Sequence, residues 1–190
     1  MDCLDLLTAD HNRVRGLFKR FKDANEKDDT ATMQEVAPKI VEELHIHMTI
    51  EEEIFYPAIS GKSEDIKDTV YEGVEEHHVA KVLVQELVGM KPSGDEWIAK
   101  VKVLIEAVEH HADEEESDMF PPVRSKTSAD QREALGTKLA NRKVELGAPP
   151  VEMALDLTME ELKDLASKQE IPGRSKMDKH ELAATVDPRG

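Results

Sequence analysis

The chain has little cysteine, few aromatic residues and no long apolar run. One of its 190 residues is cysteine, Cys3, and 4% are Phe, Trp or Tyr. A single cysteine excludes an internal disulfide and a thiolate-rich metal site, and it favours a reducing compartment. No apolar run approaches the roughly 18 residues that span a bilayer, and the N-terminus lacks the basic and apolar regions of a secretory signal. The sequence therefore predicts a soluble, cytoplasmic protein that does not bind membranes.

Basic charge is also scarce. The chain has 41 acidic and 25 basic side chains, which gives a formal net charge of −16. Any extended surface for nucleic acid or anionic lipid would have to form locally against this negative field. The composition argues against nucleic-acid binding as the main function. Because the chain has a single cysteine, nitrogen and oxygen ligands would hold any metal.

The alternating apolar pattern of strands is missing, and apolar residues recur at helical spacing instead. The chain is therefore predicted to be all-α, with long helices over about 4–25, 32–57, 64–88 and 95–120, the second and fourth ending at Pro57 and Pro121-Pro122. Long helices joined by short loops predict an antiparallel up-down-up-down four-helix bundle. We assign the bundle to residues 1–125. Residues 126–150 form an extra outer helix (about 128–146) and a Pro-containing linker, and residues 151–190 form a small helical module.

An internal repeat relates the two halves of the predicted bundle. Residues 47–57 align without a gap on residues 111–121, and a histidine, two glutamates and a proline coincide. In the preceding helices, Asp10-His11 aligns on Glu76-His77. The chain is therefore predicted to form two helical hairpins. Each hairpin supplies one histidine from its first helix and a His-x-x-x-Glu pair from its second.

The spacing of these residues indicates a cation site. Residues four apart lie on one helix face, and here that face also carries the apolar stripe, so the side chains point into the core. A buried carboxylate is costly unless it is paired or binds a metal, and no Lys or Arg lies on the same stripes. The alternative is Glu-rich solvated helix ends with ordinary core histidines, but a duplicated spacing favours a metal cluster. The predicted ligands are His11, His47, Glu51, His77, His111 and Glu115.

These residues resemble the hemerythrin family of HHE cation-binding domains. The resemblance covers about residues 4–122 and rests on the paired His-x-x-x-Glu-Glu segments that end in Phe-Tyr-Pro57 and Phe-Pro121. It implies an antiparallel four-helix bundle that holds two iron ions in an oxo- and carboxylate-bridged di-iron centre. The four histidines would be terminal ligands, and Glu51 and Glu115 would bridge the irons. Imidazole and carboxylate also suit iron on general grounds.

One position departs from the oxygen-carrying members of the family. They have a further histidine one turn before the position of His77, where this chain has Gly73. An iron position left open in this way favours reactive chemistry over reversible oxygen carriage. Tyr71 is a conceivable substitute ligand, although it falls on the helix face of the neighbouring His78. His77 is preferred to His78 because it continues the apolar stripe and aligns with His11.

Several further residues are assigned more loosely. His45 and His110 are close to predicted ligands in the sequence but lie off their apolar stripe. We therefore expect them at the surface or among groups that hydrogen-bond the ligands. Glu52 and Glu116 follow the bridging glutamates and could support the ligands in the same way. No catalytic acid or base is assigned.

The C-terminal segment 156–182 resembles the small N-terminal module of transcription terminator Rho, related to SAP-like folds. The resemblance rests on Ile171-Pro-Gly-Arg-Ser-Lys-Met177, Lys179 and Glu181-Leu182. It implies nucleic-acid contact through Arg174, Lys176 and Lys179. Because the module carries net negative charge, a role in protein docking or a purely structural role is at least as consistent with it.

The histidine and glutamate repeat, together with the resemblance to hemerythrin, implies one of two functions. The first is a di-iron protein that reacts with hydrogen peroxide, nitric oxide or oxygen in oxidative or nitrosative stress defence, as an oxidoreductase if it turns over. The second is an oxygen- or iron-binding sensor or carrier that signals through its C-terminal module without turnover. The resemblance also allows repair of iron–sulfur clusters. Related repair proteins carry a further cysteine-bearing region, which argues against this function because this chain has only Cys3. The sequence leaves the choice between turnover and binding open.

Overall fold

The computed structural model describes residues 1–189, and all elements of regular secondary structure in this part of the chain are helices, without a β-strand. The prediction of an all-α protein is confirmed. None of the helices in residues 1–189 combines the length and the apolar character needed to cross a membrane.

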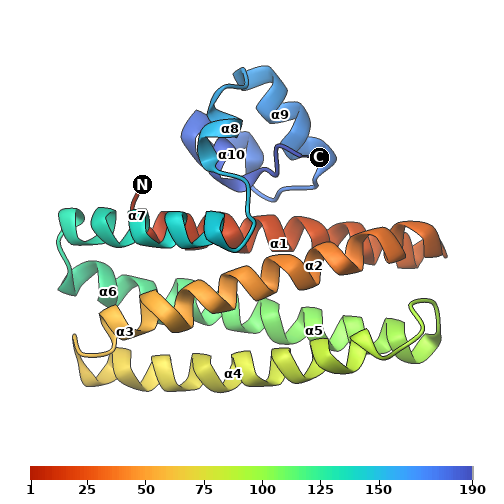
Figure 1. The fold of residues 1–190 in the computed structure, drawn as a ribbon, viewed down its shortest axis with the longest axis horizontal. Coiled ribbons are helices and arrows are strands. Elements are labelled where there is room, and N and C mark those ends of the chain that lie inside the picture. The colour runs from red at the N-terminus through yellow and green to blue at the C-terminus, as the bar shows by residue number, and fades with distance from the viewer. Residues whose placement is uncertain (190) are drawn as a thin grey trace.

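Four long helices lie alongside one another (Figure 1): α1 (Cys3–Glu26), α2 (Thr30–Ile50), α4 (Glu64–Val88) and α5 (Asp95–Glu114). Residues 27–29 join the first pair and residues 89–94 the second, so the chain forms two hairpins. Asp2, Asp29 and Ser63 precede α1, α2 and α4, and each side chain accepts a hydrogen bond from a backbone N–H of the first helical turn. Such N-caps satisfy donors that have no partner within the helix.

A short π-helical segment follows the second helix of each hairpin: η1 (Glu51–Phe55) after α2 and η2 (Glu115–Met119) after α5. The chain then continues as α3 (Tyr56–Ile59) and α6 (Phe120–Lys126). The expectation that Pro57 and Pro121 end the helical path is wrong. Both prolines lie in the first turn of the next helix, where a missing N–H breaks no intrahelical bond.

An outer helix, α7 (Ala129–Glu145), begins with a capping box between Ser128 and Gln131 and packs against α1. The contact is close at Gly136, where a Cβ atom would collide with the backbone oxygen of Met1. Cys3 is fully buried under this helix, and its burial raises the pKa of the thiol to about 12. The thiol is therefore protonated and shielded at neutral pH.

The C-terminal residues fold into a small unit of α8 (Val151–Leu155), α9 (Met159–Lys168), η3 (Arg174–Lys176) and α10 (Lys179–Thr185), which lies over α1 (Figure 1). It has its own apolar core, which includes Ala154, Leu162, Ile171, Leu182 and Val186. The buried Arg13 of α1 donates hydrogen bonds to the backbone oxygens of Ala184 (2.7 Å) and Thr185 (2.8 Å). These bonds satisfy carbonyl groups at the end of α10 and attach the unit to the bundle.

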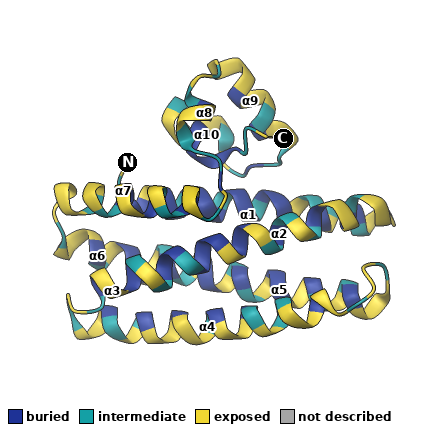
Figure 2. Cartoon of the chain, viewed as in Figure 1, coloured by how far each residue is buried: buried dark blue, intermediate teal, exposed yellow. Residues whose placement is uncertain are grey.

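The inward faces of the long helices are buried (Figure 2). Two apolar clusters fill the bundle and leave a polar layer between them. One cluster fills the half nearer the loops 27–29 and 89–94 and includes Phe18, Phe21, Leu44, Trp97 and Leu104. The other fills the half nearer α3 and α6 and includes Leu4, Phe55, Ile59, Ile66 and Phe120. The buried histidines and glutamates lie between these clusters, away from bulk water.

Candidate metal centre

The structure brings all six predicted ligand residues into the core of the bundle. The histidines come one from each long helix, and the glutamates are the first residues of η1 and η2. Each of the six side chains is 5% exposed or less, and Glu51 is fully buried. In contrast, His45, His78 and His110 are exposed. Of the two adjacent candidates on α4, His77 is therefore the one that reaches the core.

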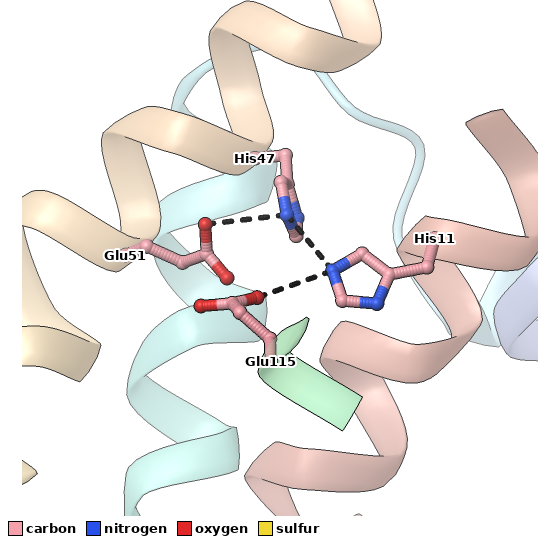
Figure 3. A group of neighbouring side chains, drawn as sticks. All are labelled: His11, His47, Glu51 and Glu115. Carbon is pink, nitrogen blue, oxygen red and sulfur yellow. Dashed lines mark hydrogen bonds and ion pairs between the residues drawn. The ribbon is translucent and has the colours of Figure 1, made fainter. Parts of the chain in front are cut away.

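The six residues form two overlapping groups. His11, His47, Glu51 and Glu115 make up one group (Figure 3), and Glu51, His77 and His111 make up the other. In each group the possible ligand atoms lie within 4.8 Å of one another. Such groupings can each hold a metal ion.

Both glutamates lie between the two histidine pairs. The Oε2 atom of Glu51 is 3.2 Å from His47 Nε2 and 3.3 Å from His77 Nε2. The Oε2 atom of Glu115 is 3.3 Å from His11 Nε2 and 3.8 Å from His111 Nε2. Each carboxylate therefore touches residues of both hairpins, which is the placement required of a group that bridges two cations.

The four imidazole rings share one orientation. Their Nε2 atoms face the centre, 3.2 Å apart for His11 and His47 and 3.0 Å apart for His77 and His111. Their Nδ1 atoms face outer carboxylates. Nδ1 of His11 lies 2.7 Å from Glu116, and that of His47 lies 3.7 Å from Asp10. Nδ1 of His77 lies 2.9 Å from Glu52, and that of His111 lies 2.7 Å from Glu76. The Nδ1 atoms of His11, His77 and His111 lie at hydrogen-bond distance, whereas that of His47 only approaches Asp10. When Nδ1 donates its proton outward, Nε2 presents a lone pair inward. Carboxylate–histidine pairs of this kind orient metal-binding imidazoles.

The centre contains oxygen atoms that the protein itself does not satisfy. Both carboxylate oxygens of Glu51 and the Oε2 atom of Glu115 are buried without a hydrogen-bond partner in the described part of the chain. An unpaired buried carboxylate is costly, and converging nitrogen lone pairs add to the cost. Divalent cations would remove both penalties, so the residues present fit a metal pair.

Burial sets the charge of the central groups. Burial, followed by the charge of Glu115, raises the pKa of Glu51 well above its ordinary value. Burial also favours the neutral form of Glu115, but the imidazole of His11, 3.3 Å from its Oε2 atom, and the nearby imidazoles of His111 and His47 outweigh it and lower the pKa of Glu115. Burial lowers the pKa of His47 to about 4 and also lowers that of His77. These two imidazoles are therefore neutral at neutral pH, the form that binds metals.

Three of the four outer carboxylates contact a lysine or arginine. Arg15 contacts Glu116 at 2.8 Å, Lys81 contacts Glu52 at 2.6 Å, and Lys143 of α7 pairs with Asp10. A hydrogen bond from His77, with Lys81, lowers the pKa of Glu52 to about 2. The sequence predicted that Glu52 and Glu116 support the ligands. The same role of Asp10 and Glu76 was not predicted, although the repeat aligns them beside two predicted ligands.

Tyr71 is not a substitute ligand, because its side chain is exposed (62%) and lies outside the core. The buried phenol beside the centre is Tyr56, whose hydroxyl donates to Glu115 Oε1 at 2.9 Å. A Cβ atom on Gly73 would lie 2.9 Å from this hydroxyl, so Tyr56 occupies space beside the position of the missing histidine. Sequence reasoning missed Tyr56.

The repeat contains the signal that distinguishes Tyr56. Phe120 stacks on His11 with ring centroids 6.0 Å apart, and Tyr56 stacks on His77 with centroids 5.6 Å apart. The two aromatic residues occupy aligned positions, as do Leu7 and Gly73. Phe120 and Leu7 thus lie near the pair of His11 and His47. Tyr56 and Gly73 occupy the aligned positions near the other pair of histidines. Only the second pair has a hydroxyl directed at the centre.

The sequence profile of the hemerythrin HHE cation-binding domain matches residues 2–123. A DNA nickase of Nostoc sp. is 30% identical over 152 residues, which cover 76% of this chain and 40% of the nickase. The uncharacterized protein Rv2633c of Mycobacterium tuberculosis is 29% identical over 152 residues, which cover 80% of this chain and 91% of that protein.

A hemerythrin-like protein of Schizosaccharomyces pombe is 27% identical over 118 residues, which cover 62% of this chain and 57% of that protein. No solved structure matches the chain. The profile covers well over half of the sequence and contains all six residues of the centre. The chain therefore belongs to the hemerythrin HHE cation-binding domain family, and its buried histidine and glutamate clusters form a site that can bind metal.

Proposed function

We propose that this protein is a non-heme di-iron protein that reacts with a small oxidant, namely hydrogen peroxide, nitric oxide or oxygen, in oxidative or nitrosative stress defence. One observation carries the proposal: Glu51 and Glu115 lie, buried and unsatisfied, between two pairs of inward-facing imidazoles. When bound, two iron ions would supply redox and Lewis-acid chemistry at this point. His11, His47, His77 and His111 would be terminal ligands, with both glutamates as bridges.

The chain's own residues favour a small reactant. The apolar clusters on both sides of the polar layer exclude bulk water. Two cavities that reach the centre in the described chain measure about 60 Å³ beside Gly73 and about 10 Å³ beside His11 and His47. Gly73 stands where oxygen-carrying members of the family have a further histidine, so we place the open position on the His77 side. Tyr56 places its hydroxyl there, 3.5 Å from His77 Nε2, where it can hydrogen-bond a small bound molecule.

The organisation of the chain is part of the proposal. We infer that the two hairpins form the antiparallel up-down-up-down bundle of the family within residues 1–125, with the outer helix and linker in 126–150 and the C-terminal module in 151–190. We also propose that the protein acts in the cytoplasm.

Reconstitution with iron tests the proposal. The apoprotein, loaded anaerobically with Fe²⁺, should retain about two irons per chain, as two four- to six-coordinate sites require. It should evolve oxygen from hydrogen peroxide or consume nitric oxide, and His47→Ala should abolish both iron retention and turnover. His45→Ala is the matched control, because His45 lies two residues away on the same helix and is exposed. An iron-loaded protein that consumes neither reactant would refute the reactive function.

A second function, sensing without turnover, is favoured by the contacts of α1. Arg13, which holds the end of α10, lies two residues from His11, and Asp10 links His47 to Lys143 of α7. A change at the centre can therefore reach the C-terminal unit through a single helix. If the protein is a sensor, removal of iron should change amide hydrogen exchange in α10. Equal exchange with and without iron would exclude this mode of signalling.

Nucleic-acid contact remains a separate proposal for the C-terminal unit. Its possible basic contacts are Arg174, Lys176 and Lys179, in and beside η3. The relative named as a DNA nickase is much longer than the part that this chain matches, so its activity on DNA is not carried over. Absence of binding to single-stranded DNA or RNA at low salt would end this proposal.

A further inference from the structure

The two hairpins differ on the outer faces that flank the metal centre. In the first hairpin the positions beside the ligands are apolar and buried under α7: Leu6, Ile46 and Ile50 are 4%, 2% and 0% exposed. The repeat aligns them on Glu72, His110 and Glu114 of the second hairpin. No outer helix packs on α4 and α5 on this side in the described chain (Figure 1). Glu72 and His110 are exposed, and Glu114 is half-buried. One side of the centre is therefore sealed and the other is acidic.

A small cavity of about 60 Å³ connects this acidic face to the centre. Glu72, Glu114 and Asp118 line its outer part, and Gly73, His111 and Glu115 line its inner part. The glycine matters because the aligned residue of the first hairpin, Leu7, is fully buried and fills the equivalent volume. At the inner end, the Oε2 atom of Glu115 is buried and has no hydrogen-bond partner within the described residues.

Three side chains at the outer end are arranged as ligands. Atoms of Glu76, His110 and Glu114 lie within 4.8 Å of one another, with His110 Nε2 3.2 Å from Glu114 Oε1 and 3.8 Å from Glu76 Oε1. The second oxygen of Glu76 contacts Nδ1 of His111, a residue of the centre, at 2.7 Å. The outer cluster and the inner centre therefore share one carboxylate. A histidine with two carboxylates suits a divalent transition-metal ion.

We propose that Glu76, His110 and Glu114 form an outer site for a divalent cation, through which metal ions enter the buried centre along the cavity beside Gly73. The inference rests on the proposed function, since the route requires a metal centre to fill. Acidic side chains at the mouth raise the local concentration of cations and speed their capture. The exposed His110 and the half-buried Glu76 and Glu114 bind the ion while water still completes its coordination. The buried oxygens of Glu115 and Glu51 then replace that water at the inner end.

The test is the rate at which the apoprotein takes up Co²⁺, followed by its visible absorption in stopped-flow experiments at low ionic strength. Glu72→Gln combined with Glu114→Gln should slow uptake roughly threefold to tenfold, the low end of electrostatic steering effects. The final number of Co²⁺ ions per chain should be unchanged. The matched control is Glu75→Gln combined with Glu106→Gln, which makes the same charge change at exposed positions of the same two helices, outside the cavity. It should leave the rate within about twofold.

His110→Ala separates metal ligation from the general field, because it removes a ligand and leaves the formal charge unchanged. Slower uptake in this variant, with the same final stoichiometry, supports the outer site. Equal rates in the wild type and all variants, or equal slowing by the cavity pair and the control pair, would overturn the proposal. If the wild-type protein takes up no Co²⁺ and no Fe²⁺, the metal centre itself fails, which is a different result.

Discussion

Tyr56 shows how one side chain can adapt a duplicated site. Its ring repeats the stacking that Phe120 provides on the other histidine pair, while its hydroxyl extends into space that Gly73 leaves free. The hydroxyl donates to Glu115, a carboxylate that is 2% exposed. Hydrogen bonds to buried charged groups are stronger than those between neutral groups, because the charge has no access to water.

Tyr56→Phe should therefore destabilise the apoprotein by about 1.5–3 kcal/mol, the contribution of a hydrogen bond to a charged group. The measurement is the free energy of unfolding in urea. Tyr71→Phe is the matched control, because the hydroxyl of this exposed residue can hydrogen-bond water in both states, and it should change stability by less than about 0.5 kcal/mol. Equal effects of the two substitutions would show that the bond to Glu115 contributes nothing.

At the scale of elements, the π-helical segments decide where the two central carboxylates lie. Each segment begins at a central glutamate, Glu51 or Glu115, and leads into a proline-containing turn. The wider turn changes the angular relation between the glutamate and the aromatic residue that follows it. This lets the glutamate lie between the two histidine pairs while Tyr56 or Phe120 stacks on a histidine of the other hairpin. Isolated π-helical turns often occur at functional sites for this reason.

The C-terminal unit meets α1 at Gly16, where a Cβ atom would collide with the backbone oxygen of Gln169. Gly→Ala inside a helix normally stabilises by about 0.5–1 kcal/mol. Here we expect the opposite sign, because the methyl group would push away the segment after α9. Gly16→Ala should lower stability and increase amide hydrogen exchange in α9 and α10.

Gly89→Ala serves as the control for this prediction. Gly89 caps α4 at φ −84°, and its added Cβ would lie 3.6 Å from the nearest atom, an ordinary contact. Exchange in α9 and α10 should stay as in the wild type. A stabilised Gly16→Ala protein with unchanged exchange would mean that the C-terminal unit does not pack closely at this point.

At the scale of the whole molecule, the centre is a junction between two hairpins. Neither hairpin alone provides a complete group, since Glu115 joins His11 and His47 while Glu51 joins His77 and His111. A cation in either group therefore links residues that are far apart in the sequence. In the apoprotein the same residues are a buried cluster of unsatisfied oxygens, which opposes docking of the hairpins.

Metal binding should therefore stabilise the whole fold. A ligand that binds only the folded chain adds about 2.7 kcal/mol at a free concentration of 100 times its dissociation constant. The unfolding midpoint in urea should rise with added Fe²⁺ or Co²⁺ and return to the apoprotein value with a chelator. His77→Ala should lose most of this increase, and His78→Ala, which alters the exposed neighbour, should keep it. The reverse order would assign the ligand on α4 to His78.

The amino-acid sequence by itself determined the helical architecture, the duplication and the six central residues. These features are local: a helical stripe and an i, i+4 pair place His47 with Glu51, and His111 with Glu115, on one face whatever the rest of the chain does. Burial of that face then brings the stripes of both hairpins together. The choice of His77 over His78 followed from the same periodicity.

The tertiary structure alone decided the features that depend on contacts between distant segments. Glu116 meets His11 across 105 residues, and Tyr56 meets Glu115 across 59. Periodicity within one helix cannot predict such contacts, because they depend on the rotation and axial shift of one helix against another. The same holds for α7, which covers one side of the centre and leaves the other side open. The sequence thus specified the six central residues, and helix packing decided their hydrogen-bond partners and the cavity beside Gly73.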